Sequence, residues 1–206
     1  MNIQHSSKTQ SHYTPSDIVE AVRRTMGGID LDPASCDQAN KVVKAESYIT
    51  KDQNGLLQDW GVWGNMRGPS KVFLNPPGER EHGTKGRPNS QLWWPKLCAE
   101  YLAGRVEQAI YVGFSLELLQ TAQGGTGPMP LDFPFCIPAK RVNFLGEDLQ
   151  PQGSPTHANV IIYLPPCGPD MKEEYTEDSI YGFRCAFSEI GRVVVPNMSC
   201  YWTGPR

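Results

Sequence analysis

The chain has 206 residues, and its 19 basic and 22 acidic side chains leave a formal net charge of −3. This length predicts one folded domain with its own hydrophobic core, and the small net charge argues against a disordered chain. No apolar run approaches the ~20 residues of a membrane span, and residues 1–14 contain no signal-like apolar stretch. We therefore expect a soluble, cytoplasmic protein with no membrane partner.

The cysteines and histidines do not have the spacing of a metal site. The six cysteines include no CxxC pair, and the four histidines form no HxxxH or HExxH pattern. The sequence therefore predicts that the protein holds no metal and that its thiols stay reduced.

Helical and strand-like patterns alternate in the first half of the chain. Apolar residues at helical spacing predict a helix from Ser16 to Met26, which Gly27 and Gly28 end. The elements expected next are a strand over 29–32 that runs into Pro33, a helix over 37–45, and a β-prone strand over 71–74. This alternation favours an α/β sheet with parallel strands.

The second half begins with a polar loop over 79–91. The elements expected after it are a helix over 92–101, a strand over 109–114, a helix over 116–123, strands over 135–137 and 159–164, and an edge strand over 191–195. The acidic stretch 168–179 is expected to be exposed. Because loops rather than helices separate these later strands, they are predicted to pair antiparallel.

The sharpest local feature is Asn75-Pro76-Pro77, directly after the run 72–74. A strand that stops at two prolines leaves the Asn75 side chain and nearby carbonyls at the carboxyl edge of a sheet, where open α/β sheets bind ligands. These oxygens form an acceptor cluster suited to an exocyclic NH2 group. A grip on both N–H bonds leaves the nitrogen lone pair available for attack.

Two earlier segments, Tyr13-Thr14-Pro15 and Asp30-Leu31-Asp32-Pro33-Ala34-Ser35, strengthen this interpretation. In this order the three segments resemble the amino-methyltransferases that use S-adenosylmethionine, and more narrowly the phage-type DNA N6-adenine methyltransferases (the phage Dam family). The matching stretches are YTPSDIVEAVRRTMGGIDLDPAS, NKVVKAESYITKDQNGLLQDW and VFLNPPG, within residues 13–78, with a weaker similarity through LWWPKLCAEYL and AIYVGFS to AKRVNFLG.

The resemblance implies a Rossmann-like methyltransferase fold, with a mostly parallel sheet and antiparallel C-terminal strands. It implies a flexible segment over 1–12 and a single methyltransferase domain over 13–206, with a DNA-facing loop at about 79–91. The implied reaction is methyl transfer from S-adenosylmethionine to N6 of an adenine flipped out of DNA, in a bacterial or phage-infected cell.

The resemblance also implies roles for individual residues. Tyr13, Thr14 and Pro15 would pack against the methionine part of the cofactor, and an acidic group in the Asp30–Ser35 segment would meet its ammonium. Asp52, Gly55 and Leu56 match the stretch that would flank its adenine, and Asn75, Pro76 and Pro77 would be catalytic. The full set expected at the cofactor is Tyr13, Thr14, Pro15, Asp30, Asp32, Pro33, Ala34, Ser35 and Asp52.

The chain departs from the family pattern at two places. Cys36-Asp37-Gln38 stands where the family has a Gly-x-Gly turn, and Gly78 replaces the aromatic residue that stacks on the flipped base in relatives. Because stacking contributes ~1–3 kcal/mol per base, another ring is needed. The candidates are Trp93, Trp94 and Phe144.

The local distribution of charge is more informative about binding to DNA than the net charge of the chain is. Residues 71–105 carry six basic and three acidic side chains, a local excess of +3. Phosphate contacts require such a local basic surface. The expected contacts are Arg80, Lys85 and Arg87 in the loop after the catalytic segment, and Arg141.

Several alternatives remain at this point. Pro165-Pro166-Cys167 has the form of a thiolate turn for cytosine C5 methylation. The acceptor cluster also suits a cytosine N4, an RNA adenine or a protein glutamine amide. Gly78 and the missing glycine turn leave room for a DNA-binding protein with a decayed active site. The oligomeric state and the recognised sequence stay open.

Overall fold

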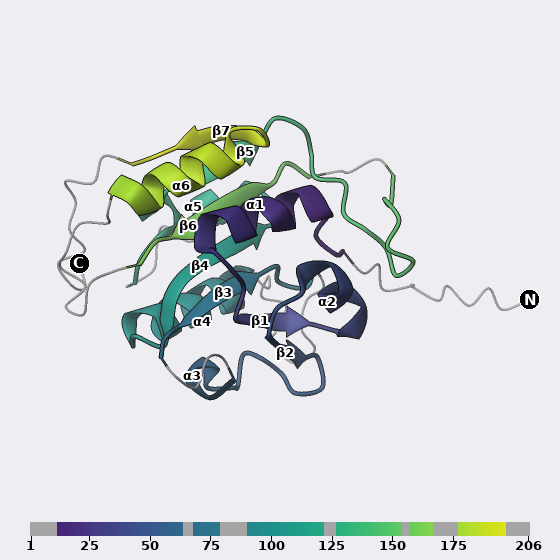
Figure 1. The fold of residues 1–206 in the computed structure, drawn as a ribbon, viewed down its shortest axis with the longest axis vertical. Helices are drawn as coiled ribbons and strands as arrows, with labels where there is room; N and C mark the ends of the chain where they lie inside the picture. Colours follow the sequence, from purple (N-terminus) through teal and green to yellow (C-terminus); the bar gives the residue numbers. More distant parts are fainter. Residues whose placement is uncertain are drawn as a thin grey trace, which may run out of the picture.

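A computed structural model describes residues 12–63, 68–78, 90–121, 127–153, 157–166 and 177–196 of the chain. The described residues form one mixed sheet with helices on both faces (Figure 1). The predicted flexible segment 1–12, except His12, and the predicted loop 79–91, except its last two residues, lie outside these ranges.

The elements follow one another in an α/β alternation. The helices are α1 (Ser16–Met26), α2 (Asp37–Val43), α3 (Trp60–Trp63), α4 (Ser90–Leu102), α5 (Glu117–Thr121) and α6 (Glu177–Phe187), with a 3-10 turn η2 (Pro130–Asp132). The strands are β1 (Leu31–Ser35), β2 (Ser47–Thr50), β3 (Ser70–Leu74), β4 (Val106–Gly113), β5 (Phe135–Pro138), β6 (Val160–Leu164) and β7 (Gly191–Val194).

The sheet is parallel in its first half and antiparallel in its second. Its seven strands lie in the order β2-β1-β3-β4-β6-β5-β7, with β2, β1, β3 and β4 parallel. β6 runs antiparallel to both β4 and β5, and β7 runs antiparallel to β5 at the edge. The predictions of a parallel sheet, of late antiparallel pairing and of a final edge strand are confirmed.

Both faces of the central strands are buried, which makes these strands continuous apolar runs. In β4, Ile110 and Val112 face the layer of α1 and α6, whereas Ala109 and Tyr111 face the layer of α4. Figure 1 shows α1 and α6 side by side on one side of the sheet. The sheet is therefore the middle of three layers. The places that the helical layers leave for a site are the amino and carboxyl ends of its strands.

Five elements differ clearly from the expectations. β1 begins two residues later than predicted and continues through Pro33 to Ser35, and α4 begins at Ser90, inside the predicted loop. β2, α3 and α6 were not predicted. In α6, Phe183, Ala186 and Phe187 are buried, but Gly182 and the charged residues around them weaken the periodic signal.

Pairing between β1 and β3 stops before their carboxyl ends. Leu31 lies opposite Val72, and the register of β1 with β2 shifts between Asp32 and Ser35. Pro33 has no N–H to donate to a neighbouring strand, and neither has Pro76 or Pro77 beyond β3. The two strand ends therefore lie side by side without a continuous ladder.

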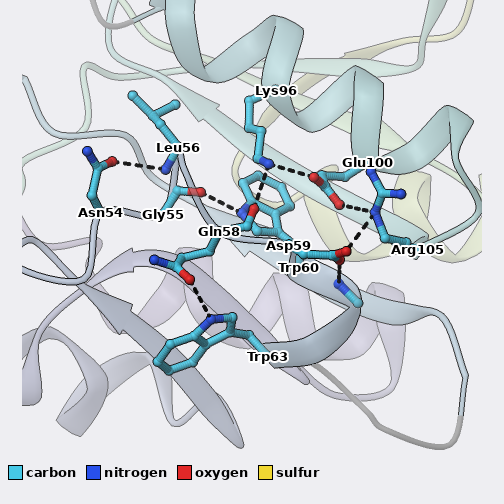
Figure 2. A network of polar contacts seen from close by, with 11 residues as sticks. Asn54, Gly55, Leu56, Gln58, Asp59, Trp60, Trp63, Lys96, Glu100 and Arg105 are labelled. Carbon is cyan, nitrogen blue, oxygen red and sulfur yellow. Dashed lines mark hydrogen bonds and ion pairs between the residues drawn. The ribbon is translucent and has the colours of Figure 1, made fainter.

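A polar network holds the loop before α3 against α4 (Figure 2). Trp60 Nε1 donates to the Gly55 carbonyl at 2.8 Å, and Lys96 Nζ donates to the Gln58 carbonyl at 2.6 Å. The buried Glu100 carboxylate binds both Lys96, at 2.6 Å, and Arg105, at 2.5 Å. Lys96 thus binds both Glu100 on α4 and the loop at Gln58, so the network holds the loop that contains Gly55 against α4.

Gly55 in turn packs against the end of β1. A Cβ built on Gly55 would lie 2.0 Å from the Pro33 carbonyl oxygen and 3.1 Å from Trp93 Cη2. No side chain fits in that space, so glycine is required for close approach rather than for an unusual φ. The contact couples α4 and its network to the carboxyl end of β1.

We expect Gly55→Ala to lower the free energy of unfolding by about 2–4 kcal/mol, because the methyl group forces the loop away from Pro33. Chemical denaturation followed by circular dichroism measures this change. The matched control is Gly28→Ala, where an added Cβ meets no atom within 4 Å and the change is expected to stay within about 0.5 kcal/mol. Equal effects at both positions would contradict the close approach.

Candidate active site at the carboxyl edge of the sheet

The carboxyl ends of β1 and β3 lie where the order of the strands reverses. From β1 the chain passes to β2 on one side and then to β3 on the other. Such a switch point is the usual ligand site of an open α/β sheet. Asp32, Pro33, Ala34 and Ser35 stand on one side of it, and Asn75-Pro76-Pro77 stands on the other.

The Asn75 side chain is oriented by the backbone of the N-terminal segment. Its Nδ2 donates a hydrogen bond of 2.8 Å to the His12 carbonyl oxygen. A carbonyl oxygen only accepts, so the amide nitrogen must face it and the orientation of the amide is determined chemically. Asn75 Oδ1 has no hydrogen-bond partner among the described residues and remains an acceptor.

Contacts with Leu145 and with Cys36, the residue after β1, hold the segment 12–15 in place. Tyr13 forms an antiparallel bridge with Leu145, with hydrogen bonds of 2.9 and 2.8 Å in the two directions. The Cys36 thiol donates to Tyr13 Oη at 3.4 Å, and Pro15 stands at the N-terminus of α1. Residues from all three sequence segments therefore meet at one edge of the sheet.

Asp32 is a buried carboxyl with no cation bound to it among the described residues. Only 3% of the residue is exposed, and Oδ1 accepts from the Ala34 N–H at 3.1 Å. Burial raises the pKa of Asp32 from 3.8 to about 7, against the opposing effects of the Ala34 N–H and the nearby Ser35 hydroxyl. A cationic ligand at this position would favour the charged form, as an ammonium group would.

Two hydroxyls at the same edge are buried without a hydrogen-bond partner of good geometry, Thr14 Oγ1 and Ser35 Oγ. An unpaired buried hydroxyl costs about 1–3 kcal/mol, and such groups are commonly satisfied by a ligand or water. Together with Asp32, they match a polar, positively charged ligand group. The residues present therefore fit the ammonium end of S-adenosylmethionine.

The structure separates the two acidic residues of the Asp30-Leu31-Asp32 segment. Asp30 Oδ2 accepts from the Lys71 N–H at 2.8 Å, at the amino end of β3 and away from Asn75. Asp30 thus links the start of β1 to the start of β3. Its expected role at the cofactor is not supported. Asp52 lies in the exposed turn past the carboxyl end of β2, on the same edge as Ser35.

The three rings predicted to stack on a base are buried. Trp93, Trp94 and Phe144 are 5%, 3% and 5% exposed, and Trp94 Nε1 donates to the Pro128 carbonyl at 2.9 Å. Trp93 and Trp94 pack in the core between α4 and the sheet. In this structure none of the three rings has an accessible face for stacking, and the two tryptophans lie on the inner face of α4.

The predicted DNA contacts are only partly within the described residues. Arg80, Lys85 and Arg87 lie outside them. Arg141 is exposed in the segment after β5, which continues to Phe144 and the bridge with Tyr13. Arg141 thus lies close in sequence to Phe144 and to the bridge, and its side chain is exposed to solvent.

His12 was missed by the sequence analysis. Its ring lies 5.2 Å from the Phe114 ring and 5.9 Å from the Phe144 ring, centroid to centroid. Its carbonyl orients Asn75. No periodicity or motif marks this residue, because its place depends on the bridge between Tyr13 and Leu145.

The alternative turn at Pro165-Pro166-Cys167 begins at the opposite edge. β6 runs antiparallel to β4, with Leu164 opposite Ala109 near the start of β4. Tyr101 Oη donates to the Pro165 carbonyl at 2.5 Å on that side. Cys167 lies outside the described residues, but the turn starts far from Asn75 and Asp32, which contradicts a shared site for cytosine C5 chemistry.

No family model matches the chain, and no curated protein matches it. Within the described ranges, no helix is long and apolar enough to cross a membrane. The same residues contain no cluster of three or more His, Cys, Asp or Glu side chains that could hold a metal ion. The inference of function therefore rests on the site itself.

The buried Asp32 predicts a measurable dependence of stability on pH. Because its folded pKa is raised above 3.8, its stabilising contribution is complete below about pH 4 and is lost as pH rises through about 7. Asp32→Asn removes this loss. The quantity compared is the free energy of unfolding of Asp32→Asn minus that of the wild type. We expect this difference to be larger at pH 8 than at pH 5 by about 2–3 kcal/mol. Urea unfolding at both pH values measures it, and a pH-independent difference would contradict the burial.

Proposed function

We propose that the chain is a DNA adenine N6-methyltransferase that uses S-adenosylmethionine. The observation that carries the proposal is the hydrogen bond from Asn75 Nδ2 to the His12 carbonyl, which leaves Oδ1 as an acceptor beside two prolines. The resemblance to phage-type amino-methyltransferases, and the parallel sheet followed by antiparallel strands that it implied, support the same function.

The cofactor would lie against the end of β1. Asp32 would bind its ammonium, and Thr14 and Ser35 offer hydroxyls to its polar atoms. When bound, S-adenosylmethionine supplies an electrophilic methyl group whose transfer leaves the bonding electrons on sulfur. Tyr13 and Pro15, next to Thr14, provide the apolar wall of this position.

Asn75 and the turn that follows would hold the acceptor amine. Asn75 Oδ1 accepts one N–H of the exocyclic amine, and a turn carbonyl such as that of Pro76 accepts the other. These bonds keep the nitrogen lone pair directed at the methyl group, so that the residues contribute by alignment and by stabilising the developing positive charge. The same grip fits cytosine N4, which product analysis distinguishes.

The defining experiment is incubation with S-adenosylmethionine labelled in its methyl group and with duplex DNA, followed by identification of the modified nucleoside. We expect N6-methyladenine. Label in N4-methylcytosine or only in RNA would replace the substrate assignment, and cofactor binding without any transfer would favour a decayed site.

Asn75→Ala is expected to lower kcat by about a hundredfold or more, because the acceptor on the amine is removed. Cofactor binding, measured by calorimetry, should change little since Asp32 and Thr14 remain. The control is Gln120→Ala, which removes an exposed amide on α5 and should leave both quantities unchanged. A near-normal rate in Asn75→Ala would remove Asn75 from the mechanism.

Cofactor affinity should fall as pH drops, because the protonated Asp32 carboxyl does not pair with an ammonium. With a pKa of about 7 for Asp32, the dissociation constant is expected to rise about tenfold between pH 8 and pH 6. Asp32→Asn should bind weakly with a flatter profile. Calorimetric titrations at several pH values test this, and an identical slope in the variant would exclude Asp32 from the binding step.

A further inference from the structure

Gly78, directly after Pro76 and Pro77, has the His12 imidazole as its neighbour. A Cβ built on Gly78 would lie 3.3 Å from His12 Cδ2 and 3.9 Å from His12 Nε2. The imidazole therefore lies in close contact with the position that the first atom of a side chain at residue 78 would take. A ring from the N-terminal segment thus stands beside the place where a ring at residue 78 would begin.

The His12 ring is supported from behind by an aromatic cluster. It tilts by 47° against Phe114 and meets Phe144 edge-on at 67°, while Phe114 and Phe144 are stacked at 25° with centroids 5.9 Å apart. These are ordinary favourable aromatic geometries. Phe144 is buried, whereas His12 and Phe114 are both half-buried, so the His12 ring keeps part of its surface accessible.

The same residue also holds the acceptor. Because the His12 carbonyl accepts from Asn75 Nδ2, the backbone of His12 is tied to the Asn75 amide. Among the described residues, His12 carries the ring whose own backbone binds Asn75, so a base whose amine is bound by Asn75 Oδ1 would lie near this imidazole. Trp93 and Trp94, by contrast, are enclosed in the core.

From these contacts we infer that the His12 imidazole is the surface on which the flipped base stacks, in place of the missing side chain at Gly78. The inference rests on the proposed function and specifies its substrate side: a planar nucleobase is held between Asn75 for its amine and His12 for its π-face. Aromatic stacking on a base tolerates different rings, so the position requires a ring rather than histidine itself.

The test compares His12→Phe, which keeps a ring, with His12→Leu and His12→Ala, which do not. All three keep the backbone carbonyl that binds Asn75. Stacking energies of ~1–3 kcal/mol convert to a loss of roughly 5- to 150-fold in kcat/KM for DNA in the Leu and Ala variants. His12→Phe should stay within about threefold of the wild type, and all three should bind S-adenosylmethionine normally.

A fluorescent reporter separates stacking from packing. With 2-aminopurine at the methylated position, the flipped base should fluoresce more strongly with His12→Leu than with the wild type or His12→Phe, because no ring quenches it. The control His157→Ala removes a second histidine that contacts the same ring, since the Phe114 ring lies 4.9 Å from that of His157. It should change neither readout, and equal effects at both histidines would overturn the inference as a general loosening of the cluster.

Gly78→Phe provides the reciprocal change. Alone it should lower kcat/KM, since the new side chain crowds the His12 ring, which lies 3.3 Å from the position of its Cβ. In the double variant His12→Ala/Gly78→Phe the ring returns from position 78, and activity should exceed that of either single variant. A double variant no better than the singles, or an unaffected His12→Leu, overturns the role of His12 while the methyltransferase assignment stands. Absence of methylation by the wild-type protein removes both.

Discussion

A hydrogen bond between residues far apart in the sequence, Asn75 Nδ2 and the His12 carbonyl, determines how the proposed site is assembled. It orients the amide after β3, and it brings the segment before α1 over the end of the sheet. The bridge of Tyr13 with Leu145 and the contact of Tyr13 with Cys36 keep that segment in place. The bond and the bridge together set the acceptor oxygen, the His12 ring and the Thr14 hydroxyl in their relative positions.

The cofactor side of the site is held at a cost in stability. Asp32 is buried, and burial raises its pKa, so the folded protein does not favour the carboxylate. The unpartnered hydroxyls of Thr14 and Ser35 add to this cost. The packing of Gly55 on Pro33, fastened by the Glu100 network, contributes in the opposite direction by keeping the end of β1 in place. The polar groups are thus positioned before any ligand arrives.

The sequence predicted the parallel core, the antiparallel end and the position of Asn75 after a strand, since each depends on local patterns. It did not separate Asp30 from Asp32, because residues two apart share a face of a strand and only the pairing of Asp30 with Lys71 distinguishes them. It placed Trp93 and Trp94 at the substrate, although the inner face of α4 buries both. No sequence pattern identified His12, because its position depends on tertiary contacts alone.

The interrupted pairing of β1 and β3 has a consequence for ligand entry. Pro33, Pro76 and Pro77 lack amide hydrogens, and the pairing of the two strands does not extend beyond Leu31 and Val72. A molecule bound between these strand ends would therefore displace no backbone hydrogen bond of the ladder and would need no separation of the sheet.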